Sequence, residues 1–199
     1  MFMHGGFQHI LFNMFALWMF GTAVESFLGS KKFIFLYISA GLGAALLQLI
    51  YYYFKFYSGI DTLTAAGFET SQVLEVLTSG FNRYDTRWDS ILSQDQLSNF
   101  VGVFNSSMVG ASGAIIWVLV AFGMLFPENK LMLIFLPIPI KAKYFIPRLI
   151  ALDLFSAVTG VSIFSPSNTA FIAHIGGALT GFIIMYFWKK DQFNKYRWN

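Results

Sequence analysis

The chain has 199 residues, of which 56% are hydrophobic and 12% are charged, and its mean hydropathy is +0.61. This composition lies outside the range of soluble domains and predicts a membrane protein. The net charge of +3 is too small to indicate nucleic-acid binding. Because the chain has no cysteine, disulfides, thiol nucleophiles and thiolate metal sites are excluded.

Long apolar stretches predict an all-α polytopic membrane protein. Each of five stretches approaches the roughly 20 residues that a spanning helix needs. The five predicted spans are Phe7–Leu28, Phe33–Phe54, Met108–Phe126, Tyr144–Phe164 and Ala170–Trp188. A further apolar run, Leu131–Ile140, is too short to cross a bilayer and contains two prolines, so we expect an interfacial connector there.

Basic residues are unevenly distributed among the segments that connect these spans. Most of the 13 lysines and arginines fall in the turn before the second span, in the loop before the fourth, and in the C-terminal tail. The positive-inside rule assigns these segments, and with them the C-terminus, to the cytoplasm. This charge bias and the absence of a transit peptide from the sequence favour a bacterial inner membrane as the location.

Residues 55–107, between the second and third spans, form the only stretch with the polar, acidic composition of a soluble segment. Within this stretch we predict a short helix over Ser71–Leu77, with Ser71 as its N-cap and Val73, Leu74 and Leu77 on one face. We expect an extramembrane insertion in a single membrane domain of residues 1–199. The insertion is either a solvated loop or a cap that screens a site below it.

The first span carries two of the three histidines of the chain. His9 and Asn13 are four residues apart, which puts both side chains on one helix face, and His4 precedes them. Two donors stacked on one face suit an oxyanion hole built from side chains. The alternative is that they hydrogen-bond to a neighbouring helix and have only a structural role.

Ser112 lies at the head of the third span, in a turn with Gly110 and Gly113. The glycines permit a tight turn, and the start of a helix directs free N–H groups toward the serine region, where they stabilise negative charge. These features suit a nucleophile. The alternative is a patch of small residues that packs against another helix.

His174 lies in the last span, beside a stripe in which Ala173, Gly177 and Gly181 recur at intervals of four. Such a stripe lets a helix approach the backbone of its partner closely. If the partner is the helix that begins at Ser112, the imidazole comes within reach of the hydroxyl. His174 would then be the general base and Ser112 the nucleophile.

The motifs His4-x4-His9-x3-Asn13, Gly110-x-Ser112-Gly113 and Ala173-His174-x2-Gly177-x3-Gly181 lie in this order on separate spans. Together they resemble the motifs of the rhomboid family of intramembrane serine proteases, over nearly the whole chain except residues 55–107. The resemblance implies a rhomboid-like helical bundle with a catalytic dyad of Ser112 and His174. It also implies an oxyanion hole formed by His9, Asn13 and the Ser112 N–H, with His4 in a structural role.

By the same resemblance, the expected activity is cofactor-free serine endopeptidase cleavage of single-span membrane proteins near the outer membrane surface. Active rhomboids have a core of six spans, whereas this chain starts almost at the histidine motif. We therefore expect five of the six spans, with the first one missing. Residues 1–199 alone would then be poorly stable or inactive.

Other functions remain as alternatives. An inactive rhomboid-like protein would bind membrane helices without cutting them, and a small transporter would line a path with Ser112, His174 and Asp153. Asp153 could orient His174 as a third catalytic residue, but intramembrane acids more commonly pair with polar groups for structural reasons. The sequence has no metal-ligand motif, so we expect no metal and no cofactor.

Overall fold

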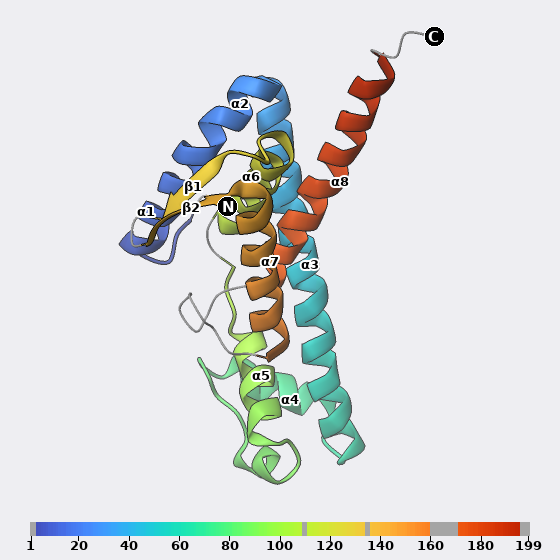
Figure 1. The fold of residues 1–199 in the computed structure, drawn as a ribbon. Coiled ribbons are helices and arrows are strands. Elements are labelled where there is room, and N and C mark those ends of the chain that lie inside the picture. Colours follow the sequence, from blue (N-terminus) through green and yellow to red (C-terminus); the bar gives the residue numbers. More distant parts are fainter. Residues whose placement is uncertain (1–2, 109–110, 134–135, 160–170, 196–199) are drawn as a thin grey trace. The chain divides into compact units, whose positions relative to one another are not determined.

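The computed structural model describes residues 3–108, 111–133, 136–159 and 171–195. The chain divides into two compact units, one of Met1–Gln48 with Val109–Asn199 and the other of Leu49–Met108. The first unit contains most of the helices, all drawn in Figure 1. Its elements are α1 (Phe7–Ala16), the π-helical turn η1 (Leu17–Gly21), α2 (Thr22–Leu28), the first half of α3 (Ser30–Ala65), α6 (Ser112–Leu125), β1 (Lys130–Leu133), β2 (Leu136–Lys141), α7 (Ala142–Thr159) and α8 (Phe171–Lys195).

The protein is an all-α polytopic membrane protein with one short hairpin. In the described part of the chain, three helical segments are long and apolar enough to span a bilayer: Phe7–Leu28, Ser30–Ala65 and Phe171–Lys190. The predicted first span has the bounds of the first of these, although one π-helical turn interrupts its α-helix. The other two predicted spans correspond to α6, which has 14 residues, and α7, which has 18. Residues 109–110, 160–164 and 170 of the predicted spans lie outside the described residues.

Helix α6 is the central helix of the first unit. Every residue from Gly113 to Phe122 is buried, so this helix is apolar on all sides and enclosed by its neighbours. It contacts both α7 and α8, which also contact each other (Figure 1). The core around α6 includes Phe20 of η1, Leu36 of α3 and Met185 of α8. The residue that opens α6 therefore lies at one end of the most buried helix of the unit.

The outer faces of α1, α3 and α8 expose large apolar side chains, including Phe12, Leu42 and Ile183. In water such a surface would be an aggregation liability, but in a bilayer it is matched to the lipid tails. Helix α3 has 36 residues and is about 54 Å long at 1.5 Å per residue, well beyond the roughly 30 Å of the hydrocarbon core. It extends eleven residues past Phe54, where we expected the span to end.

The predicted interfacial connector is a β-hairpin. Strands β1 and β2 pair antiparallel, with Lys130 opposite Lys141 and Leu131 opposite Ile140. Pro137 and Pro139 have no backbone N–H to donate, and a two-stranded hairpin tolerates them because each strand is an edge. A hairpin of this size agrees with the prediction that Leu131–Ile140 does not cross the bilayer.

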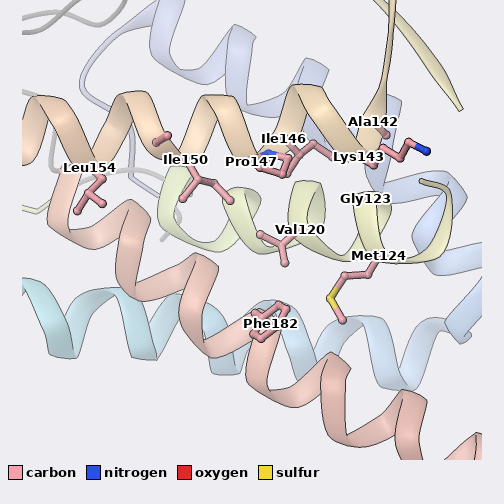
Figure 2. Close-up of a pocket in the computed structure, with 11 residues that line it drawn as sticks. Val120, Gly123, Met124, Ala142, Lys143, Ile146, Pro147, Ile150, Leu154 and Phe182 are labelled. Carbon is pink, nitrogen blue, oxygen red and sulfur yellow. The ribbon is translucent and has the colours of Figure 1, made fainter. Parts of the chain in front are cut away.

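Figure 2 shows a pocket between α6, α7 and α8 with a volume of about 510 Å³. Its lining is apolar apart from Lys143 at one end. Val120 and Met124 come from α6, Ile150 from α7 and Phe182 from α8. None of the site residues predicted from the sequence lines it.

Glu128, in the turn before β1, forms ion pairs with Lys141, at 2.7 Å, and with Lys143. The ammonium groups of Lys141 and Lys143 donate hydrogen bonds to Glu128, and these bonds lower its pKa from 4.5 to about 2. The bond from Lys141 has the larger effect. A lowered pKa means that the stabilisation is present above about pH 4.5 and is lost as the pH falls toward 2. The Glu128 side chain is 60% exposed, so the effect on stability is small and screened by salt.

We therefore expect Glu128→Gln to leave the thermal midpoint at neutral pH nearly unchanged and to flatten its decline between about pH 4.5 and 2. Thermal unfolding in detergent at several pH values measures this. Glu75→Gln, at an exposed carboxylate in α4 with no such lysine pair among the described contacts, is the control. If the thermal midpoint fell equally with decreasing pH in wild type and Glu128→Gln, the prediction would be contradicted.

The second unit contains the end of α3 and three shorter elements: α4 (Thr70–Thr78), the 3-10 helix η2 (Thr86–Ser90) and α5 (Gln94–Phe104). Its core includes Trp88, Leu63, Leu77 and Phe100. Close packing of α3 on α5 requires Gly59, because a Cβ at that position would overlap the Phe100 ring. The predicted insertion, residues 55–107, thus corresponds to a compact unit with its own core, and its extramembrane location stays a prediction.

The helix predicted for Ser71–Leu77 is present as α4, but its predicted N-cap is wrong. The helix begins at Thr70 after Glu69, and no side chain caps it. Val73 and Leu77 are buried as predicted, whereas Leu74 is exposed. Helix α5 instead has a complete capping box, in which Ser93 and Gln96 exchange side-chain and backbone hydrogen bonds.

Candidate active site

Ser112 is the first residue of α6, after Ala111 as N-cap. Within the described residues no side-chain hydrogen bond caps this end, so the first backbone N–H groups of the helix have no side-chain acceptor there. Ser112 is half-buried, whereas the residues that follow it are buried. A hydroxyl at this position has the positive end of the α6 dipole directly beneath it. Gly110 lies outside the described residues.

Glycines allow the start of α6 to approach α8 closely. A Cβ on Gly177 would overlap the carbonyl oxygen of Gly113, and a Cβ on Gly113 would lie 3.3 Å from the carbonyl oxygen of Ala173. Further along the same face, a Cβ on Gly181 would overlap Trp117 of α6. The predicted stripe on α8 therefore packs on α6. Gly113, which follows Ser112, therefore contacts Ala173, which precedes His174.

The adjacent face of α8 packs closely on α3. A Cβ on Gly176 would lie 2.9 Å from the carbonyl oxygen of Gly43, and the Ala173 N–H donates to Oε1 of Gln48 at 3.0 Å. Gln48 is buried. These contacts fix the first turn of α8 between α3 and α6, and His174 belongs to that turn.

His174 is buried, and its Nδ1 lies 2.9 Å from Oδ2 of Asp153 on α7. The two side chains are only 11% and 17% exposed. This contact engages one ring nitrogen and leaves Nε2 as the nitrogen that can take a proton from a nucleophile. Among the hydrogen bonds of the described residues, none joins His174 to Ser112.

His9 and Asn13 lie on one face of α1, as their spacing predicts. His9 Nδ1 accepts a hydrogen bond from the Gly5 N–H at 3.2 Å, so a neutral imidazole carries its proton on Nε2 and can donate it. Asn13 is buried, and its Nδ2 donates to the His9 carbonyl at 2.8 Å, which leaves its second N–H for another acceptor.

His4 packs edge-on against His9, with ring centroids 5.4 Å apart. His4 and Gly5 lie in the segment that precedes α1, and their contacts with the His9 ring hold it in place. The structural role that the resemblance implies for His4 stays a prediction.

The start of α6, the first turn of α8 and the helix α1 that bears His9 belong to one unit, in which α6 contacts both α1 and α8. Two contacts of His174 and its turn were not predicted from the sequence. Asp153, set aside above as a structural acid, contacts His174 directly, and Gln48 anchors the adjacent backbone. No group of three or more metal-ligating side chains occurs among the described residues.

Curated relatives match most of the chain. The presenilin-associated rhomboid-like protein A, mitochondrial, of Danio rerio is 29% identical over 181 residues, which is 90% of this chain and 34% of that protein. Rhomboid protein 1, mitochondrial, of Saccharomyces cerevisiae is 25% identical over 94% of this chain and 39% of that protein. Rhomboid protease GluP of Bacillus subtilis is 39% identical over 49 residues, a quarter of this chain and a tenth of that protein. A comparison with solved structures found no significant match.

These relatives correct the predicted location. The proteins matched over nine-tenths of the chain are mitochondrial by name, so the prediction of a bacterial inner membrane with a cytoplasmic C-terminus is wrong. The chain spans little more than a third of the length of these relatives. The absence of a transit peptide from residues 1–199 therefore carries no information about location.

The family model described as the Rhomboid domain matches residues 1–190. This match covers all three sequence motifs, the whole of the second unit and all but the last nine residues of the first. The chain belongs to the rhomboid family.

Proposed function

We propose that this chain is the core of an intramembrane serine endopeptidase of a mitochondrial membrane, with single-span membrane proteins as substrates. The observation that carries the proposal is the glycine packing of α6 on α8, where Gly113 meets Ala173 and Gly177. This packing sets the start of the buried helix α6 beside the turn that bears His174. A hydroxyl, an imidazole and helix N–H groups that have no side-chain acceptor among the described residues suit acyl transfer when they lie in one place.

In the proposed reaction, Ser112 Oγ attacks the carbonyl carbon of the scissile peptide as its proton passes to Nε2 of His174. The developing oxyanion accepts hydrogen bonds from the Ser112 N–H, from His9 Nε2 and from Asn13 Nδ2. The C–N bond then breaks, and the imidazolium gives its proton to the leaving amine. Water, deprotonated by the same imidazole, hydrolyses the acyl-enzyme and restores Ser112.

The test is cleavage of a reporter with one transmembrane segment by the full-length protein in liposomes. We expect Ser112→Ala and His174→Ala each to lower the cleavage rate by about 10³-fold or more. Ser30→Ala is a matched control, because Ser30 likewise opens a helix but is exposed at the start of α3. Undiminished cleavage in both site variants would eliminate this mechanism.

A second candidate function is helix binding without cleavage. It is favoured by the lack of a hydrogen bond between Ser112 and His174 among the described residues, since an unassembled dyad has no activated nucleophile. A fluorophosphonate probe separates the two candidates. Labelling of the wild type that is lost in Ser112→Ala supports the protease, whereas binding of the reporter segment with neither labelling nor cleavage supports the helix-binding protein.

A further inference from the structure

The pocket between α6, α7 and α8 is lined by none of the residues of the candidate active site. Its volume of about 510 Å³ lies within the range of pockets that bind small ligands in proteins. Apart from Lys143, its lining side chains carry no charged or strongly polar group. The chemistry of this lining selects a hydrocarbon.

The pocket is accessible from the lipid side of the protein. Leu154 of α7 and Phe182 of α8 line it and are 52% and 47% exposed. Ala142 and Ile146, which line it from the inner side of α7, are buried. Because α8 is long and apolar enough to span a bilayer, its exposed face meets lipid tails. A lipid chain therefore reaches the pocket without crossing water.

The length of the pocket matches one leaflet of a bilayer. Along α7 it extends from Lys143 to Leu154, which lie at opposite ends of the α7 residues drawn in Figure 2. At 1.5 Å per residue this segment is about 16 Å long, close to half of the roughly 30 Å hydrocarbon core. The acyl chains of each leaflet fill half of that core. One extended acyl chain thus fits the pocket from end to end.

A transmembrane helix of a substrate is too wide for this pocket. A helix with its side chains is about 10–12 Å across, so a length of about 16 Å occupies at least about 1,200 Å³. This volume is more than twice that of the pocket. The dimensions therefore favour a single hydrocarbon chain over a helix.

Two lysines bring positive charge to one end of the pocket. Lys143 lines that end, and Lys189 of α8 donates to the carbonyl oxygen of Met124, another lining residue, at 3.4 Å. Both lysines are exposed, so their ammonium groups can extend to the membrane surface. Tyr144 and Trp188, which adjoin them in the sequence, are residues of the type that marks the headgroup level. The charged end of the pocket therefore lies where lipid headgroups lie.

The surroundings of this end carry an excess of positive charge. Residues 128–143 and 189–191 contain five lysines and two acidic residues. Of the two lysines at the pocket, Lys143 pairs with the exposed carboxylate of Glu128. No ion pair of Lys189 occurs among the described residues. Phosphate oxygens accept hydrogen bonds from ammonium groups as carboxylates do, so an anionic group is the complement of this end.

We propose that the pocket binds one acyl chain of an anionic phospholipid, whose phosphate is held by Lys143 and Lys189. Basic pockets between transmembrane helices at a membrane surface are suited to such headgroups. A phosphatidylcholine offers the same chain and phosphate, but its choline cation is repelled by the lysines. The inference does not depend on cleavage by Ser112, because the pocket and the candidate active site share no residue.

The test uses the full-length protein in phosphatidylcholine nanodiscs that contain phosphatidylglycerol with a diazirine at the end of one acyl chain. After illumination, mass spectrometry of peptides locates the attached lipid. We expect labelling near Leu154 and Phe182, because the chain end lies away from Lys143. A phosphatidylcholine probe with the same chain should label these sites about tenfold less, since it lacks the net negative charge.

Charge variants test the headgroup site. Lys143→Gln and Lys189→Gln should each lower the preference for phosphatidylglycerol about fivefold. Lys190→Gln is the matched control, because it removes the same charge from the same end of α8 at an exposed residue that does not line the pocket. Glu128→Gln should raise the labelling by phosphatidylglycerol, because it frees Lys143 for the phosphate. Such a gain cannot come from misfolding.

A filling variant tests the chain site. Ala151→Phe places a ring in the pocket from an exposed position of α7 and should abolish labelling by both probes. Val158→Phe introduces the same side chain on the same helix, at a residue that is 79% exposed and does not line the pocket. It should leave labelling unchanged. Equal labelling of the two variants would overturn the assignment of the chain to this pocket.

Three further outcomes would overturn the proposal. The first is equal labelling of the wild type by the two lipid probes. The second is an equal effect of Lys189→Gln and Lys190→Gln. The third is labelling of the pocket by a diazirine on the transmembrane segment of the reporter, which would make it a protein-docking site. None of these readouts requires cleavage, so the failure of this proposal is distinct from the failure of the protease function.

Discussion

Gly177→Val should separate α6 from α8 and lower reporter cleavage by at least about 10²-fold. The Cβ of any residue at this position would overlap the Gly113 carbonyl oxygen, which is backbone and cannot rotate away as a side chain can. Lipid provides no hydrophobic force that would restore the contact, so the helices part. Displacing His174 from Ser112 by about 1 Å is enough for a loss of this size. The cleavage assay and thermal unfolding in detergent measure the two consequences.

The matched control is Leu179→Val, which introduces the same side chain two residues further along α8, where Leu179 is exposed. It tests whether a β-branched residue in this helix is itself harmful. We expect wild-type cleavage and an unchanged thermal midpoint for the control, and a lower midpoint for Gly177→Val. Because unfolding does not depend on activity, equal midpoints in the two variants would refute the packing argument whatever the protein catalyses.

The stripe on α8 could be predicted because it is a local pattern. Ala173, Gly177 and Gly181 recur every four residues, which defines a face, and the structure packs that face on α6. That α6 is the partner is predicted on chemical grounds, from the serine at its start. Gly176 shows the limit of this approach: it lies off the stripe, and its close contact with Gly43 of α3 was not predicted.

The contact between Asp153 and His174 could not be derived from the sequence. The two residues are 21 positions apart on different helices. No periodicity relates one helix to the next, so the sequence specifies which face each residue occupies but not which helix it meets. The one signal in the sequence is that acidic residues are rare in this region, since Asp153 is the only one between Lys130 and Lys190. A carboxylate in an apolar helix is costly unless it pairs with a polar or charged group, and His174 is one such group in this chain.

Local signals were also insufficient within residues 55–107. The predicted serine cap of α4 is wrong because the apolar contacts of Val73 and Leu77 set the helix, which begins one residue earlier and without a side-chain cap. The acidic composition suggested a solvated loop. Yet the segment encloses a core of its own, because Trp88 and Phe100 are buried there together with Leu63, Leu77 and other apolar residues.

Trp88→Ala should destabilise this second unit by about 3–5 kcal/mol. Trp88 is fully buried, and its ring meets Phe68 and Phe100 edge-to-face, with centroids 6.5 and 6.0 Å apart. Trp88→Phe should cost much less, because it keeps an aromatic ring and removes an indole N–H that has no hydrogen-bond partner among the described residues. Hydrogen exchange of residues 49–108 in the intact protein measures the local free energy of unfolding.

Phe81→Ala is the control, since Phe81 is an exposed aromatic residue of the same unit, and it should leave exchange unchanged. Equal protection in Trp88→Ala and Phe81→Ala would contradict the assignment of the core to Trp88. The same variants decide between the two interpretations of residues 55–107. If the unit is a solvated insertion, Trp88→Ala opens it without changing reporter cleavage, because the glycine contacts between α6 and α8 are made within the other unit. If the unit caps the site, cleavage changes together with the loss of protection, and Trp88→Phe gives an intermediate value of both.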